Sequence, residues 1–162
     1  MTVTDVNVVK SAIFERPDDA NKGTLGSLLC VCGSYGMAGA AVMSAKGALR
    51  TGIGLAKCAL PRSIYLIVAQ TILESVYYPL SENADGRISK VNVPFLVSES
   101  CKSSATLVGC GLGVCDDTLK IVFSLIENST TPLVLDADAL NCVAKQPEIL
   151  LRKKAPIIIT PH

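Results

Sequence analysis

The chain has 162 residues, of which 49% are hydrophobic and 18% are charged, and its formal net charge is +1. This length suits one domain with a buried core, and this composition excludes a largely disordered chain. The basic residues are scattered, so a nucleic-acid interface is not expected. No apolar run is long enough for a membrane span, so none is expected either.

Residues 1–20 are expected to form a leader segment ahead of the domain. They show no basic region followed by an apolar stretch, so no signal peptide is expected. The chain has seven cysteines, an odd number, and several lie inside apolar runs rather than in loops. This pattern predicts reduced thiols that pack as small hydrophobic side chains, and a cytoplasmic location. A zinc site is not expected, because no second pair of ligands accompanies the closely spaced cysteines.

Apolar and polar stretches alternate along the chain as strands and helices do in α/β proteins. Helices are predicted at residues 39–52, 62–73 and 116–128, with the second of them buried and the third capped by Asp116 and Asp117. Residues 81–90 are expected to be a polar surface loop. Strands are predicted at residues 26–34, 54–61, 74–80, 105–113, 131–141 and 155–162, the last of them buried.

Strands that alternate with helices predict a mostly parallel sheet with helices on both faces. Ligands of such sheets bind at the carboxyl ends of the strands. Four of the predicted strands end in a glycine loop or a polar cluster, at residues 33–36, 109–113, 136–138 and 160–162. The sequence therefore predicts a site along one edge of the sheet.

The first strand is followed by a candidate phosphate or nucleotide loop that contains Gly33, Ser34, Gly36 and Gly39. Glycine lets backbone N–H groups approach an anion, and the start of the next helix adds a partial positive charge. The spacing fits neither a Walker loop nor a strict GxGxxG fingerprint. Tight strand-to-helix packing is the alternative explanation for the small residues, and the sequence leaves both open.

Two carboxylates, Asp136 and Asp138, leave a hydrophobic strand, where charge is costly unless it meets solvent, a metal or a phosphate with Mg²⁺. Asp138 is predicted to be the N-cap of the next helix, which makes Asp136 the better functional candidate. Asn141 falls one turn into that helix. His162 is the only histidine, and a lone histidine after a strand has no assigned role by itself.

Taken together and in order, the motifs resemble the carbohydrate-kinase-like domain of the NAD(P)H-hydrate dehydratases, which has a ribokinase-like fold. The resemblance spans residues 21–162 and rests on NKG, GSYGMAGA, GCGLG, LDADALN and TPH. The sequence departs from the family pattern at Asn21, where a histidine is common, and at Cys110, which stands for a proline and gives the loop more backbone freedom.

The resemblance implies a repair reaction in which hydrated NADH or NADPH is converted back to the intact dinucleotide with ADP or ATP and Mg²⁺. A hydroxyl on the reduced nicotinamide ring is phosphorylated, and phosphate then leaves by elimination. By motif, Ala40, Gly111 and His162 contact the substrate, while Asp136 and Asn141 line or support its pocket. Metal ligands stay unassigned, and NAD(P)H-hydrate epimerase is the implied functional partner.

The family domain continues beyond the TPH motif to a glycine-rich loop with the aspartate that acts as general base. Residues 1–162 are therefore expected to be a partial ribokinase-like domain whose C-terminal part is absent, with no catalytic residue of its own. The sequence leaves open whether the chain is active alone, forms a homo-oligomer or is completed by a partner chain. A non-catalytic nucleotide-binding remnant and a small-molecule alcohol kinase of the same superfamily are the alternatives.

Overall fold

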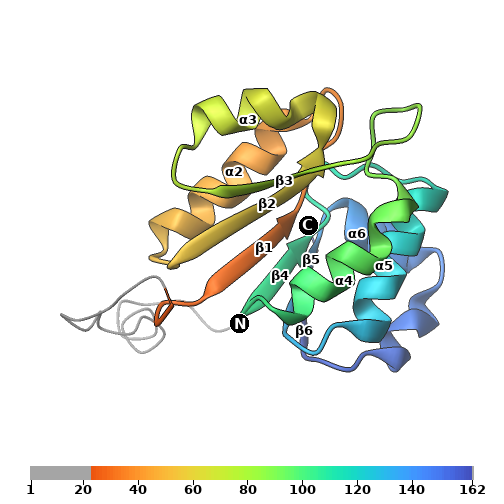
Figure 1. Ribbon diagram of the computed structural model, residues 1–162. Coiled ribbons are helices and arrows are strands. Elements are labelled where there is room, and N and C mark those ends of the chain that lie inside the picture. The colour runs from red at the N-terminus through yellow and green to blue at the C-terminus, as the bar shows by residue number, and fades with distance from the viewer. Residues whose placement is uncertain (1–22, 162) are drawn as a thin grey trace.

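A single parallel sheet organises the chain (Figure 1). The computed structural model describes residues 23–161; the predicted leader at 1–20, and Asn21 and His162, lie outside the described residues. The strand order is β3-β2-β1-β4-β5-β6, and every pair of neighbours is parallel. The strands are β1 (Ser27–Val31), β2 (Leu55–Pro61), β3 (Val76–Leu80), β4 (Ala105–Val108), β5 (Leu133–Asp136) and β6 (Ile157–Thr160).

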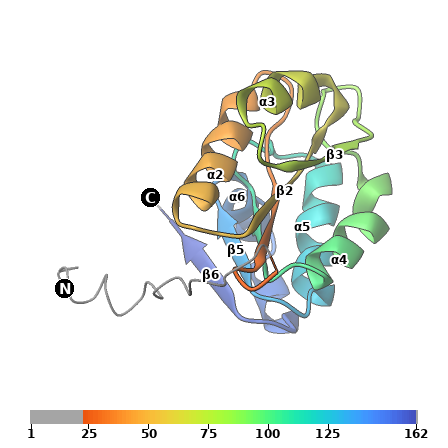
Figure 2. The ribbon, with the colours of Figure 1, turned by 60° about the vertical axis from the view of Figure 1, so that its left-hand side comes forward.

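Helices cover both faces of this sheet, which confirms the predicted fold class (Figure 2). The α-helices are α2 (Ala38–Arg50), α3 (Tyr65–Thr71), α4 (Val93–Cys101), α5 (Asp116–Asn128) and α6 (Asp138–Ala144). Short 3-10 helices are η1 (Arg62–Ile64), η2 (Lys90–Asn92) and η3 (Pro147–Arg152). Within residues 23–161, no helix is both long and apolar enough to cross a membrane.

Successive side chains of β1 point to opposite faces of the sheet, and both faces are covered, which explains the apolar run at residues 28–32. Leu29 and Val31 belong to the core cluster beneath α4, α5 and α6, whereas Cys30 and Cys32 belong to the cluster beneath α2 and α3. Side chains of successive strand residues point to opposite faces, so a strand buried on both sides needs apolar residues at every position. The two cysteines are at most 2% exposed and pack as small apolar side chains, as expected.

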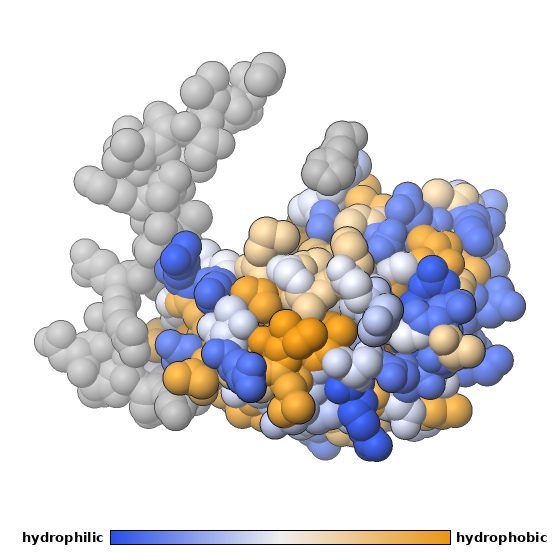
Figure 3. All heavy atoms as spheres, turned by 90° about the horizontal axis from the view of Figure 1, so that it is seen from above, coloured by the Kyte–Doolittle hydropathy of each residue, from blue (hydrophilic) through white to orange (hydrophobic). Residues whose placement is uncertain are grey.

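The helix at residues 62–73 was expected to be buried, and this expectation is wrong for one of its faces. Val68 and Ile72 are buried, but Leu66, Ile67 and Leu73 are 64%, 57% and 83% exposed. Figure 3 views the molecule from the side on which α3 lies and shows an apolar region there. The outer face consists of exposed positions 62, 63, 66, 67, 70 and 71, and Leu66 and Ile67 interrupt the polar residues on it.

The last strand was also expected to be buried, and it is not. β6 lies at an edge of the sheet, and Ile158 and Ile159 are 58% and 50% exposed. The core cluster under α2 and α3 draws its buried strand residues from β1 and β2. β6 lies beyond the reach of those helices, because three strand positions separate it from β1.

Helix α5 is capped, although not by the aspartates that were expected to cap it. Its N-cap is Cys115, whose backbone N–H donates to Thr118 Oγ1 at 2.9 Å. Asp117 instead accepts hydrogen bonds from Asn83 Nδ2 at 2.9 Å and from the Lys90 backbone N–H at 3.1 Å. This carboxylate therefore ties the loop at residues 81–90 to the start of α5.

Candidate functional site

The loops after β1 and β4 are joined directly to one another at the carboxyl edge of the sheet. Ser34, which is 6% exposed, donates from its hydroxyl to the Gly111 carbonyl at 2.8 Å. The Gly33 backbone N–H donates to the Cys110 carbonyl at 2.9 Å. Because β1 and β4 are neighbours, the glycine loop and the GCGLG loop form one continuous surface.

Ala40 and Gly111, two of the predicted substrate contacts, lie against each other in this surface. Gly111 has a φ of +66°, and a Cβ atom placed on it would lie 2.7 Å from the Ala40 Cβ. Any side chain at position 111 would therefore be strained and would displace Ala40. The structure brings together two residues that are far apart in the chain.

The first turn of α2 is open toward the same edge. Its N-cap, Met37, makes no side-chain capping hydrogen bond. Gly36 and Gly39 are exposed, and nothing lies within 4 Å of a Cβ atom built on either residue. The first N–H groups of a helix have no partner within the helix and favour an anion. This geometry suits the phosphate contact that was predicted for the loop.

Asp136 connects the ends of three neighbouring strands. Its Oδ1 accepts a hydrogen bond from the Thr160 hydroxyl at 2.6 Å, and its Oδ2 accepts one from the Cys110 thiol at 3.1 Å. Thr160 ends β6, and Cys110 follows β4. The predicted site residue Asp136 is therefore held by side chains from the strands on either side of β5.

Asp138 was expected to cap α6, and the structure corrects this. The N-cap is Ala137, at a φ of +47°, and Asp138 is the first residue of the helix. The Asp138 carboxylate accepts from the Gly113 backbone N–H at 2.8 Å and from Asn141 Nδ2 at 3.3 Å. Asn141 thus orients the carboxylate that anchors the GCGLG loop, and its predicted supporting position is at the edge of the same site.

A hollow of ≈440 Å³ adjoins the glycine loop, and sequence analysis did not find it. It lies between Tyr35 and the loop at residues 81–90, which was expected to be only a polar surface loop. The Tyr35 backbone N–H donates to the Gly86 carbonyl at 2.8 Å, and the Glu82 carboxylate accepts from the Ser63 hydroxyl at 2.6 Å. Tyr35 is 75% exposed in the structure, and the signal available in the sequence was an aromatic residue within the glycine loop, next to Gly36.

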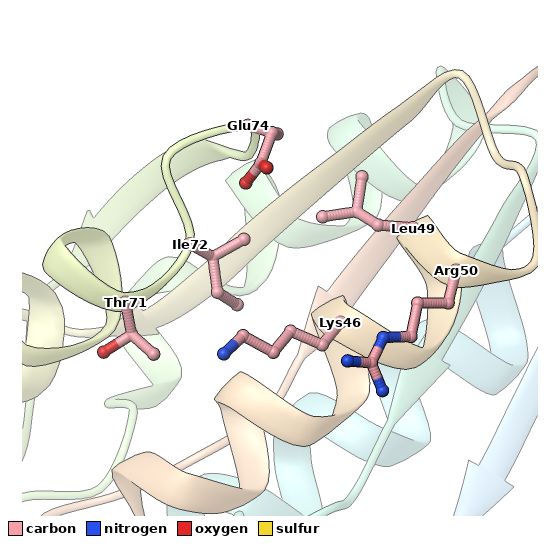
Figure 4. Close-up of a pocket in the computed structure, with 6 residues that line it drawn as sticks. All are labelled: Lys46, Leu49, Arg50, Thr71, Ile72 and Glu74. Carbon is pink, nitrogen blue, oxygen red and sulfur yellow. The ribbon is translucent and has the colours of Figure 1, made fainter.

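A second, smaller pocket of ≈240 Å³ lies away from these loops, between the C-terminal parts of α2 and α3 (Figure 4). Lys46 extends from α2 toward Thr71 of α3, and Arg50 lies one turn further along α2. Helix α2 begins beside the loops at the carboxyl ends of the strands, so its C-terminal part lies near the amino ends of the strands. None of the predicted site residues lines this pocket.

Asp136 and Asp138 bring negative charge to the site, and the Cys110 thiol lies beside Asp136. A hydrogen bond from the Cys32 thiol lowers the pKa of Cys110, and burial and the Asp136 carboxylate act against that shift. Residues 23–161 contain no cluster of three or more acidic, cysteine or histidine side chains that could hold a metal ion.

Comparisons with known proteins agree with this arrangement of fold and loops. The sequence profile of the NAD(P)H-hydrate dehydratase family matches residues 28–162. The bifunctional NAD(P)H-hydrate repair enzyme of Thermofilum pendens is 34% identical over 147 residues, which are 91% of this chain and 28% of that enzyme.

Two solved structures share the fold. One is a ribokinase-like superfamily protein from Enterococcus faecalis, with a TM-score of 0.76 and 19% identity over 93% of this chain and 50% of that one. The other is the ADP/ATP-dependent NAD(P)H-hydrate dehydratase of Bacillus subtilis, co-crystallised with ATP and Mg²⁺. Its TM-score is 0.72 at 25% identity, covering 96% of this chain and 51% of that chain. The chain thus spans about half the length of these two structures.

Proposed function

Because the chain belongs to the NAD(P)H-hydrate dehydratase family, we propose that its strand-end loops bind hydrated NADH or NADPH for dehydration at the expense of ADP or ATP. In this reaction the ring hydroxyl takes the terminal phosphoryl group of the nucleotide. The C–O bond then breaks, the ring loses a proton, and inorganic phosphate leaves with the oxygen. The product is the intact dihydronicotinamide ring, so atoms and charges balance.

The contact between Ala40 and Gly111 is the observation that carries this proposal. Both residues belong to motifs for which the family resemblance implies substrate contact, and their smallness lets the two loops pack directly against each other, so that the two motifs form one surface. The open first turn of α2 lies next to them and suits a phosphate of the dinucleotide. Asp136 and Asn141 border the same edge through Thr160 and Asp138.

The nucleotide supplies the phosphoryl group, and the Mg²⁺ that accompanies it neutralises the charge that develops on its oxygens. The described residues contribute binding and orientation. Both oxygens of Asp136 already accept hydrogen bonds, from the Cys110 thiol and the Thr160 hydroxyl, so we give this carboxylate a positioning role. We propose that the base comes from the part of the relatives' length that this chain does not match.

A turnover assay tests the proposal. The chain is incubated with hydrated NADPH, ADP or ATP, and Mg²⁺, alone and together with the C-terminal half of the Bacillus subtilis enzyme, and the return of dihydronicotinamide absorbance is followed. We expect turnover in the mixture and little or none with either half alone. Robust turnover by the 162-residue chain alone would show that no further general base is required. A stably phosphorylated product without elimination would favour an alcohol kinase instead.

A matched pair of variants separates substrate binding from folding in this assay. Ala40→Val adds two methyl groups at the contact with Gly111, whereas Ala48→Val makes the same change two turns further along α2, away from the loops. We expect Ala40→Val to raise the concentration of hydrated NADPH needed for half-maximal rate, and Ala48→Val to leave it unchanged. Equal effects of the two variants would contradict a role for Ala40 at the substrate.

A further inference from the structure

Two thiols meet at the base of the candidate site. Cys32 follows β1 and is 1% exposed, whereas Cys110 follows the neighbouring strand β4 and is half-buried. The hydrogen bond from the Gly33 N–H to the Cys110 carbonyl, at 2.9 Å, holds the two backbones together just beyond the last paired residues of the strands. Neighbouring strands lie about 4.8 Å apart, within the Cα separation of about 4.4–6.8 Å that a disulfide spans.

The two sulfur atoms are also unequal in chemistry. Interaction between the two thiols raises the pKa of Cys32 and lowers the pKa of Cys110, and the Asp136 carboxylate acts against the shift of Cys110. Cys110 therefore carries more thiolate character, and it is also the partner that solvent reaches. Cys32 is the buried thiol that lies next to it.

A second pair of cysteines in the sheet provides a contrast. Cys30 and Cys58 are register partners on β1 and β2, so their backbones are also close enough for a bridge. Both are at most 2% exposed, and burial raises the pKa of each thiol. Since oxidation follows thiolate character and exposure, proximity alone gives this pair no route to react.

We propose that Cys32 and Cys110 are a dithiol modification site that hydroperoxides oxidise to a disulfide, with Cys110 attacking and Cys32 resolving. The Cys110 sulfur attacks one oxygen of the hydroperoxide, the O–O bond breaks, and the alcohol or water leaves with the thiol proton. The Cys32 sulfur then displaces the hydroxyl group from the resulting sulfenic acid, and water leaves with the second proton. Two thiols are oxidised, and one hydroperoxide is reduced.

Formation of this disulfide changes the candidate site directly. The Cys110 thiol donates to Asp136 Oδ2 at 3.1 Å, and a disulfide sulfur has no proton to donate. The carboxylate keeps the hydrogen bond from Thr160 but loses the one from Cys110. The inference does not depend on the proposed reaction, because it concerns the chemistry of the thiols alone.

The test uses the full chain and hydrogen peroxide at a stoichiometric concentration. The reaction is stopped with catalase, free thiols are blocked with N-ethylmaleimide under denaturing conditions, and unreduced peptides are sequenced by tandem mass spectrometry. Fragmentation between Cys30 and Cys32 assigns the linked sulfur. We expect a crosslink between Cys32 and Cys110, reversed by dithiothreitol, with Cys30 and Cys58 blocked as free thiols. Free Cys32 beside an oxidised Cys110, or a crosslink between Cys30 and Cys58, would overturn the proposal.

Two serine variants with a matched control give an independent readout. In Cys32→Ser the resolving thiol is lost, so we expect sulfenic acid to accumulate at Cys110 and to be trapped by dimedone. In Cys110→Ser we expect Cys32 to remain reduced. Cys101→Ser, which removes an exposed thiol far from the pair, should leave the crosslink intact. Dimedone labelling of Cys101 in place of Cys110 would contradict the assignment of the attacking sulfur.

Discussion

Replacing Gly39 with alanine separates a binding role of the glycine loop from a packing role. Gly39 lies in the first turn of α2, and Gly47 lies two turns further along the same helix. Both are exposed, neither has a positive φ, and nothing lies within 4 Å of a Cβ atom built on either residue. Alanine is favoured over glycine inside a helix by about 0.5–1 kcal/mol. Each variant should therefore raise the free energy of unfolding by about that amount, which for a domain of this size shifts Tm by about 1–4 °C.

The two variants should differ in ligand binding. At Gly39 the new methyl group occupies the open space beside the first N–H groups of α2, where we propose that a phosphate lies. Loss of that contact should weaken binding by about tenfold, equivalent to about 1.4 kcal/mol. Isothermal titration with NADPH and thermal unfolding are measured on the same preparations, with Gly47→Ala as the control. Unchanged NADPH affinity in Gly39→Ala, alongside the expected gain in stability, would refute phosphate binding at this turn.

Three further predictions concern stability. Gly109→Ala should destabilise the fold by more than about 2 kcal/mol in urea unfolding, because Gly109 has a φ of +126° and its Cβ would collide with the Asp136 carbonyl; wild-type stability would show that the loop adapts. Thr160→Val removes the hydroxyl that donates to Asp136 and should cost about 1 kcal/mol in the same assay; no loss would show that this hydrogen bond is energetically neutral. A hydrogen bond from Asn83 lowers the pKa of Asp117 below its usual 3.8, so this carboxylate stabilises the fold above that pH, and the contribution is lost as the pH falls through the lowered pKa. Asn83→Ala should therefore raise the pKa of Asp117 in an NMR titration and reduce the stability difference between neutral and acidic pH; an unmoved pKa would contradict this cause.

The strand-end site could be predicted because parallel topology alone places all carboxyl ends at one edge. Gly33, Gly111 and Asp136 each follow an apolar run, so their shared edge follows from the pattern of strands and helices. The contact between Ala40 and Gly111 could be anticipated only through the family resemblance. Small size at both positions is visible in the sequence, but which loops face each other depends on strand order, which periodicity does not reveal.

The two errors about helix caps have a common physical cause, which is competition from distant partners. Asp138 has the residue type and position of an N-cap, yet its carboxylate accepts from the Gly113 N–H in another loop. Asp117 likewise accepts from the loop at residues 81–90 rather than from the first turn of α5. Local patterns describe what a side chain can do within its own turn, whereas the folded chain offers it partners that are remote in sequence.

Exposure of the apolar segments was not predicted, for a different reason. Ile158 lies in the isoleucine run at 157–159 of β6 and Leu66 lies in the apolar run at 64–69, and such runs are typical of buried elements. Their exposure follows from the place of each element, with β6 at the edge of the sheet and α3 on the outside of its layer. The isoleucine run of β6 carries no signal of which face remains uncovered, whereas in the segment at 62–73 the polar residues at 62, 63, 70 and 71 do mark the outer face.

Mapping the bound substrate by NMR tests the central claim most directly. Isotope-labelled chain is titrated with hydrated NADPH, and amide shifts are followed residue by residue. We predict that the largest changes cluster at Ser34, Ala40 and Gly111 along the carboxyl edge of the sheet. Changes centred instead on Lys46 and Thr71, in the pocket between α2 and α3, would contradict the account and move the binding site to the opposite edge.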